Sequence, residues 1–256
     1  MSRKITAITL SLLIVSTIGC TLITPPDVDV PPGSGNGVIF PAPQPSTPPK
    51  HPDTIYIGED SKVMVSNVDS ILVLVNKKRN LPATYVPVDL SRADVPFPFD
   101  GDHPRMYLRE EAARALEDLF DSAATAGLEL YATSGYRSYE TQAAIFAANV
   151  AKVGEEEANK TSAVPGQSEH QTGLAMDVTS AVVNYRLVES FGETEEGMWL
   201  AQNAHHFGFI IRYPKGKEDI TGYSYEPWHV RYVGTEAAKL IFPRALTLEE
   251  YILYGN

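Results

Sequence analysis

A proline-rich stretch near the N-terminus limits where this chain can fold. Between Thr24 and Pro52 the 256-residue sequence is crowded with Pro, Gly and Ser, as in Pro31-Pro32-Gly33-Ser34-Gly35. Such a stretch cannot bury enough apolar surface to offset the chain entropy lost on folding, so we expect a semi-extended tether. No comparable break follows. We therefore predict a tether over residues 20–54 and one folded domain over residues 55–256.

The segment that precedes the tether has the layout of a secretory signal. A short basic region leads into an apolar run from Ile5 to Ile18, which is too short for a comfortable membrane span. The residues before Cys20 resemble the bacterial lipobox, although Thr17 stands where leucine is usual. We expect a lipoprotein-type signal peptide over residues 1–19, with Cys20 lipidated. An ordinary signal peptide or an uncleaved anchor is the alternative.

Composition narrows the remaining classes of protein. Cys20 is the only cysteine, so no intramolecular disulfide can form and the fold depends on its core or on a metal. The chain has 32 acidic and 21 basic residues, a formal net charge of −11. Nucleic-acid binding depends on clustered Lys and Arg, so we expect no nucleic-acid partner.

Helical patterns recur along the domain. Apolar residues at helical spacing run from Leu108 to Ala123, and Gly127 can close that helix. Ser138 can cap a second helix from Tyr139 to about Val153. A third helix is expected over 194–208. Thr247 and Glu250 form a capping box for a last helix.

Extended patterns lie between these helices. We expect strands over 128–133, 174–179, 209–213 and 228–233. The apolar run at 71–75 fits either a strand or a buried first turn of a helix. Because helices and short strands mix without a regular strand-helix-strand rhythm, the sequence predicts an α+β fold.

Two short segments concentrate the residues that can bind a metal. The first contains His170 and Asp177, and the second contains Glu226 and His229. A catalytic zinc needs three protein ligands and one open position for water. We expect His170, Asp177 and His229 to be the ligands. Glu226 then stays free to take a proton from the zinc-bound water and return it to the leaving amine.

Each of these residues also has an ordinary structural interpretation. A lone buried histidine is usually a satisfied core residue, and an aspartate at a strand end is often a cap. The other histidines have no comparable setting, and we expect the pair His205 and His206 to lie on a helix surface. The metal hypothesis therefore depends on the two segments taken together.

The two segments resemble the signature of the VanY-type D-alanyl-D-alanine carboxypeptidases. The matching motifs are Ser168-x-His170-x-x-Gly173-x-Ala175-x-Asp177 and Glu226-x-x-His229. The resemblance covers roughly residues 70–256 and includes Ser-Gly-Tyr-Arg-Ser at 134–138. It implies one Zn²⁺ per chain held by His170, Asp177 and His229, with Glu226 as the catalytic base. It also implies an α+β fold with a small antiparallel central sheet, flanking helices, and the zinc site on the sheet and adjoining loops.

The same resemblance places Arg137 in the active site, where its guanidinium can hold the carboxylate of the substrate or an oxyanion. We expect Ser168 and Gln142 to help bind the substrate. The implied substrates are peptidoglycan stem peptides, cleaved at the D-Ala-D-Ala bond. We accordingly expect a monomer outside the cytoplasm of a bacterium, either lipid-anchored on the outer face of the cell membrane or secreted to the wall.

The same residues bear on rival functions. A serine D,D-peptidase needs Ser-x-x-Lys and a zincin needs His-Glu-x-x-His, and the chain contains neither. An inactive zinc-containing wall-binding module would be expected to lose Glu226, which is present. An L,D-carboxypeptidase that removes D-Ala from tetrapeptide stems would share the same metal site, so the sequence leaves the cleaved bond open.

Overall fold

The structure of this protein is a computed structural model, and it describes residues 55–57 and 63–254. The expected signal peptide, the lipidation site Cys20 and the tether over 20–54 lie outside the described residues. Within the described ranges, no helix is long and apolar enough to cross a membrane.

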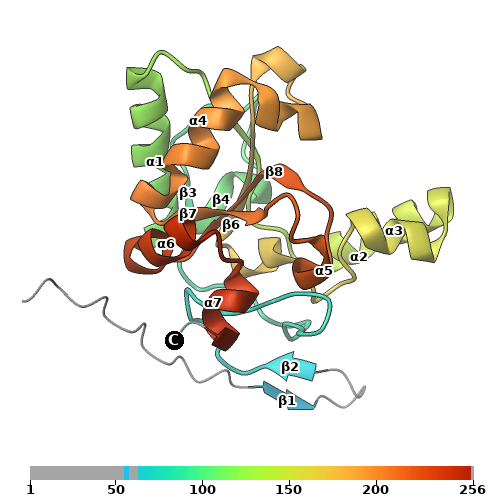
Figure 1. Ribbon diagram of the computed structural model, residues 1–256. Coiled ribbons are helices and arrows are strands. Elements are labelled where there is room, and N and C mark those ends of the chain that lie inside the picture. The colour runs from blue at the N-terminus through green and yellow to red at the C-terminus, as the bar shows by residue number, and fades with distance from the viewer. Residues whose placement is uncertain (1–54, 58–62, 255–256) are drawn as a thin grey trace, which may run out of the picture. The chain divides into compact units, whose positions relative to one another are not determined.

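A four-stranded antiparallel sheet forms the centre of the domain (Figure 1). Its strands lie in the order β5-β6-β8-β7, with bounds Tyr131–Ser134 for β5, Ala175–Thr179 for β6, Glu226–Tyr232 for β8 and Phe209–Tyr213 for β7. The register places Asp177 of β6 opposite His229 of β8. Because residues directly opposite each other share one face of a sheet, these two side chains are brought together by the pairing itself.

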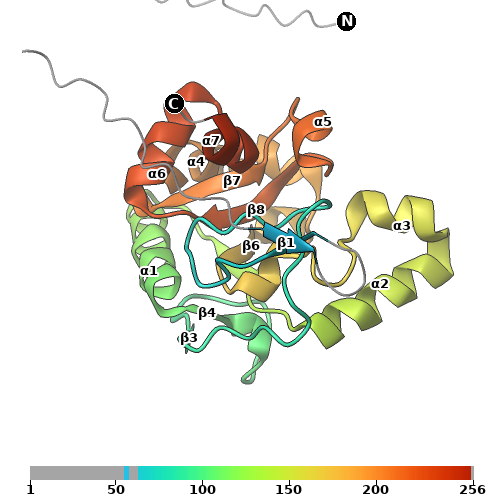
Figure 2. The same ribbon diagram turned by 90° about the horizontal axis from the view of Figure 1, so that it is seen from below.

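Helices flank the sheet on two sides. Helices α2 and α3 lie to one side in both views, and α1 and α6 lie to the other (Figures 1 and 2). The helices are α1 (Glu110–Thr125), α2 (Tyr139–Val153), α3 (Glu155–Thr161), α4 (Glu195–Asn203), α5 (Glu218–Thr221), α6 (Thr235–Ile241) and α7 (Leu248–Tyr254). Two further antiparallel pairs join β1 (Ile55–Ile57) to β2 (Val63–Val65) and β3 (Leu90–Arg92) to β4 (Tyr107–Arg109). The α+β prediction is confirmed.

Helix α1 supplies one wall of the main core. Its buried face contains Ala112, Leu116, Leu119 and Phe120, which pack into the same cluster as Met176 and Val178 of β6. Burying one such large apolar side chain contributes roughly 1.5–3 kcal/mol. This core fixes the position of β6, and β6 carries Asp177.

The expected strand over 128–133 begins later than predicted, at Tyr131. The reason is the way α1 ends. Gly127 has φ of +81°, and the Leu128 amide donates to the Ala123 carbonyl at 3.0 Å. This is the hydrogen bond of a Schellman motif, which draws the residue after the glycine back onto the helix.

The apolar run at 71–75 is neither a strand nor a helix. It is a buried, irregular segment whose carbonyl groups at Ile71 and Val73 accept hydrogen bonds from Arg231 at 2.9 and 2.8 Å. Both predicted alternatives were wrong, because a buried arginine replaces the backbone partners that regular structure would supply.

Other predicted elements are confirmed. Helix α2 spans Tyr139–Val153, and the Ser138 hydroxyl accepts from the Thr141 amide at its N-terminus. The Thr247–Glu250 capping box forms in both directions before α7. The expected helix over 194–208 is α4 followed by a 3-10 turn that ends at Gly208. Sequence patterns missed the short helices α3, α5 and α6.

Candidate metal centre and active-site cleft

His170 lies in a 3-10 helix over Glu169–Thr172, which ends at Gly173 with φ of +67°. Its Nδ1 atom is 2.9 Å from the carbonyl oxygen of Gly135. A carbonyl can only accept, so Nδ1 carries the ring proton and Nε2 keeps its lone pair. That is how a protein prepares a histidine ligand, because the second hydrogen bond fixes the tautomer.

Gly135 is needed for this contact. A Cβ atom at this position would lie 2.5 Å from the Tyr107 carbonyl oxygen and 2.9 Å from the Met176 methyl group. Only glycine lets the loop after β5 pass so close to β4 and β6. The loop then presents the Gly135 carbonyl to His170 and carries Arg137 toward the same site.

Asp177 and His229 complete a three-residue group. The Asp177 Oδ1 atom is 3.0 Å from His229 Nδ1, and Oδ2 is 3.4 Å from His170 Nε2. One ligand atom from each of the three residues lies within 4.8 Å of the other two. All three side chains are buried. We call His170, Asp177 and His229 the metal-ligand group.

The charges of the group fit a metal cation. Asp177 is 4% exposed, and among the described residues no Lys or Arg forms an ion pair with it; its partners are the two histidines. Burial alone would raise the pKa of Asp177, but the adjacent His170 and His229 hold that pKa below its usual range. A buried carboxylate facing two imidazoles, beside an open cleft, is a donor set that catalytic zinc sites use.

Glu226 lies beside the group as the first residue of β8. Its Oε2 atom is 3.9 Å from His229 Nδ1. Burial raises the pKa of Glu226 to about 7; His229 and Arg137 lower it, and Asp177 raises it further. A carboxylate that titrates near neutral pH is well matched to accept and return a proton.

Arg137 is held at the cleft by two side chains. It donates to Gln142 Oε1 at 2.8 Å and to the Ser134 hydroxyl at 2.9 Å. Gln142 is 1% exposed, and its amide donates to the Ala163 carbonyl at 2.6 Å. In the structure Gln142 thus positions Arg137 through its Oε1 atom, and its direct contact with a substrate stays a prediction.

A cleft of about 460 Å³ opens over the metal-ligand group. Arg137, Ser168, Glu226 and the three ligands line it, so the structure brings these predicted residues together. Sequence reasoning missed several other lining residues, namely Leu187, Glu189, Tyr213, Tyr223, Tyr225 and Trp228. Two of these tyrosines, Tyr223 and Tyr225, lie within three residues before Glu226 in the sequence. Their closeness to the predicted base was a signal that they line the cleft.

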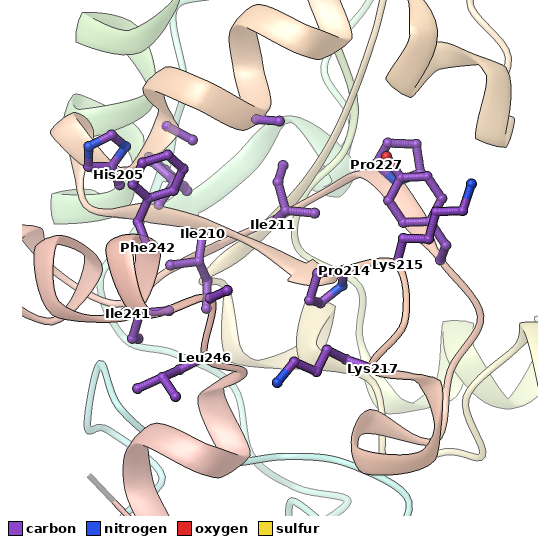
Figure 3. A pocket seen from close by; sticks show the side chains of 15 residues that line it. His205, Ile210, Ile211, Pro214, Lys215, Lys217, Pro227, Ile241, Phe242 and Leu246 are labelled. Atoms are coloured by element: carbon purple, nitrogen blue, oxygen red, sulfur yellow. The ribbon is translucent and has the colours of Figure 1, made fainter. Parts of the chain in front are cut away.

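A second cavity of about 340 Å³ shares Tyr225 with the cleft but has a different character. Figure 3 shows its mostly apolar lining, with His205 and Phe242 at one end and Lys215 at the other. The His205 ring stacks on Phe242 with centroids 3.8 Å apart. Across residues 55–57 and 63–254, the metal-ligand group is the one cluster of three or more His, Cys or acidic side chains close enough to share a metal.

Comparison with known proteins gives a direct family assignment. The family model for VanY, D-alanyl-D-alanine carboxypeptidase, matches residues 105–235. This chain belongs to the VanY family. The match spans every member of the metal-ligand group together with Arg137 and Glu226, so the resemblance seen in the sequence is confirmed.

Relatives and solved structures agree. The protein YodJ of Bacillus subtilis (strain 168) is 53% identical over 200 residues, covering 77% of this chain and 73% of YodJ. The structure of the LdcB LD-carboxypeptidase is 51% identical with a TM-score of 0.75, covering 78% of this chain and 92% of LdcB.

Two vancomycin-resistance structures are also similar. A variant of the D,D-pentapeptidase VanY in complex with Zn(II) is 39% identical with a TM-score of 0.59, covering 71% of this chain and 98% of that protein. VanYB in complex with D-alanine-D-alanine is 39% identical with a TM-score of 0.61, covering 72% of this chain and 98% of that one. This protein is thus a carboxypeptidase of the VanY family.

Proposed function

We propose that this protein is a zinc-dependent carboxypeptidase that removes the terminal D-alanine from peptidoglycan stem peptides. The observation that carries the proposal is the buried metal-ligand group beside Glu226, at the floor of a cleft. His170 Nε2, the Asp177 carboxylate and His229 Nδ1 would hold the ion. A zinc ion there supplies a Lewis acid that lowers the pKa of water and polarises the scissile carbonyl.

The residues of this chain supply the remaining chemistry. Glu226 takes the proton from the attacking water and later delivers it to the amine of the departing D-alanine. The Arg137 guanidinium binds the terminal carboxylate of the substrate with charge-assisted hydrogen bonds, and Ser168 lines the same cleft. Gln142 and Ser134 keep Arg137 aimed at that position, which limits the entropy lost when the substrate binds.

We further propose that the preferred bond is the L,D bond of a tetrapeptide stem. The likeness to the LdcB LD-carboxypeptidase supports this choice, since identity and TM-score are both higher than for the D,D-pentapeptidase VanY. Cleavage of the D-Ala-D-Ala bond of pentapeptides is the second candidate, and the match to the D-alanyl-D-alanine carboxypeptidase family supports it.

One assay separates the two candidates. Purified protein is incubated with synthetic tetrapeptide and pentapeptide stems, and the products are identified by mass spectrometry, with a chelated sample as the control. Tripeptide produced from the tetrapeptide supports the L,D assignment, and tetrapeptide that accumulates from the pentapeptide supports D,D cleavage. If neither stem is cleaved by zinc-loaded protein, the proposed activity is wrong.

Peptidoglycan lies outside the cytoplasm, so the proposed substrate implies an extracytoplasmic enzyme. We propose that Cys20 carries a lipid that tethers the domain to the membrane, and that the domain acts as a monomer. Cys20→Ser should release the protein from the membrane fraction. Membrane association that does not change would contradict the lipid anchor.

A further inference from the structure

Glu169 is a buried carboxylate with one oxygen satisfied and one not. It immediately precedes His170 and is 1% exposed. Its Oε1 atom accepts from Arg212 Nε at 2.7 Å and from Arg231 Nη1 at 2.6 Å. Its Oε2 atom has no hydrogen-bond partner among the described residues. Buried polar atoms are seldom left unpaired without a reason.

The Nε2 atom of His229 faces this unpaired oxygen. It is buried and, within the described part of the chain, has no hydrogen-bond partner either. The two unpaired atoms face each other across 3.5 Å. A small rotation of the ring or the carboxylate would shorten this separation to an ordinary hydrogen bond.

The other ring nitrogen of His229, Nδ1, faces the other members of the metal-ligand group, and it is 3.0 Å from Asp177 Oδ1. A neutral imidazole has one protonated and one unprotonated nitrogen. If Nδ1 is to give its lone pair to a metal, the ring proton must be on Nε2. An acceptor aimed at Nε2 favours that tautomer, and Glu169 Oε2 is in this place.

We propose that Glu169 is a positioning residue that fixes His229 in the tautomer needed to bind zinc. This inference rests on the metal site of the proposed function. It adds to that site the residue that holds one of the ligands, because metal-binding histidines commonly donate their second N–H to a carboxylate or a carbonyl. His170 does so to the Gly135 carbonyl, and Glu169 supplies the equivalent acceptor for His229.

Three other side chains keep this acceptor charged and in place. Arg212 and Arg231 lie on neighbouring strands and are 0% exposed. Arg212 also donates two hydrogen bonds to Glu249, at 2.8 and 2.6 Å. We call Glu169, Arg212, Arg231 and Glu249 the buried arginine network. Its two carboxylates match its two guanidinium groups, so Oε1 of Glu169 is fixed and Oε2 is left for His229.

The substitution Glu169→Gln tests this arrangement sharply. Only the glutamine carbonyl oxygen can accept the two arginine donors, so the NH₂ group must take the place of Oε2. It would then present a donor to His229 Nε2 and favour the proton on Nδ1. We expect the zinc affinity, measured by chelator competition, to fall by about 10–100-fold.

Glu249→Gln is the matched control. It makes the same change of charge, in the same network and on the same partner Arg212, but it has no contact with His229 among the interactions of the described residues. We expect its melting temperature to fall much as in E169Q, while its zinc affinity stays within about twofold of the wild type. Equal losses of zinc affinity in the two variants would overturn the proposal, because they would show a general loss of stability.

A spectroscopic readout needs no variant. In the zinc-loaded wild type, nuclear magnetic resonance of the histidine ring nitrogens should show a proton on Nε2 of His229, protected from exchange with water. A proton on Nδ1 instead would overturn the inference.

If E169Q does not fold, the variant Glu169→Asp replaces it. Aspartate retains the charge but withdraws the acceptor from His229, and an unchanged zinc affinity in that variant would also overturn the inference. Failure of the wild type to bind zinc would reject the proposed function itself.

Discussion

The metal-ligand group and the buried arginine network are neighbours, since β8 carries His229 and Arg231 and one 3-10 helix carries His170 and Glu169, but their charges are matched in different ways. In the network, two arginines meet two glutamates, and every arginine donor group bonds to a carboxylate or a carbonyl. In the metal-ligand group, Asp177 meets only two histidines. In the network, protein donors answer every carboxylate oxygen but Oε2 of Glu169, whereas no Lys or Arg among the described residues forms an ion pair with Asp177, and the group has the donor atoms to hold a metal ion.

This difference separates structural charge from functional charge. A buried ion pair that is fully bonded does little more than offset its own desolvation, and it is strongly destabilising only when one partner is removed. An incompletely matched cluster next to a cleft has a ligand as its natural partner. We therefore expect substitutions in the two regions to affect different measurements: metal binding and turnover in the group, and mainly the free energy of unfolding in the network, except at Glu169, which also faces His229.

The largest effect is expected for His229→Ala. It removes one of three ligands, so bound zinc and hydrolysis of stem peptides should both drop below detection, while far-ultraviolet circular dichroism stays unchanged. His205→Ala is the control, because that histidine lies in the apolar cavity and should leave zinc content and turnover unaltered. An active H229A variant would contradict the assignment of metal binding and turnover to the metal-ligand group.

Glu226→Gln should follow in size. The amide keeps the shape of the side chain but cannot accept a proton, so kcat should fall by about 10²–10⁴-fold. Zinc content and Tm should stay at wild-type values, and KM should change little because Arg137 still binds the substrate. If the variant loses its zinc, Glu226 is a ligand and the assignment of Asp177 must be revised.

Arg212→Met addresses the network. It leaves Glu169 and Glu249 buried with one fewer cation, which should cost about 3–5 kcal/mol of unfolding free energy and lower Tm by roughly 6–20 °C. Arg114→Met is the control, since its ion pair with Glu117 is largely exposed on the arginine side and should contribute at most about 1 kcal/mol. Similar losses in both variants would show that the network is not specially sensitive.

The smallest effect is expected for Glu250→Gln, next to Glu249 on α7. Burial on its own would raise the pKa of Glu250, but hydrogen bonds from the Thr247 amide and Lys217 hold it below its ordinary value. A lowered folded-state pKa contributes stability that is present above the unfolded pKa of about 4.3 and is lost as the pH falls through the folded value. We expect a deficit of about 0.5–1 kcal/mol at pH 7 that shrinks toward pH 3, measured by urea denaturation. A deficit that does not change with pH would contradict this account of the cap.

Much of the site could be predicted from local sequence. His170, Asp177, Glu226 and His229 are recognisable because metal chemistry demands particular residue types at short spacings. Helix α2 was predicted with its observed bounds because its capping serine, Ser138, is a local signal.

What could not be predicted depends on contacts between distant residues. The irregular segment at 71–75 is stabilised by Arg231, about 160 residues along the chain. The bonds that Gln142 forms to Arg137 and to the Ala163 carbonyl were likewise not predicted. The role of Glu169 depends on Arg212 and Arg231, which in sequence are only charged residues inside apolar strands. An arginine inside an apolar strand was the available signal in the sequence, since a buried arginine needs a buried acceptor.

Calorimetric titration tests most directly whether one cation completes the metal-ligand group. Protein stripped by a chelator is titrated with Zn²⁺ beside E226Q, H229A and R212M, at a temperature where all four are folded. We predict one zinc per chain for the wild type, E226Q and R212M, and no stoichiometric binding for H229A. Absence of binding in the wild type, or one tightly bound zinc in H229A, would contradict the account.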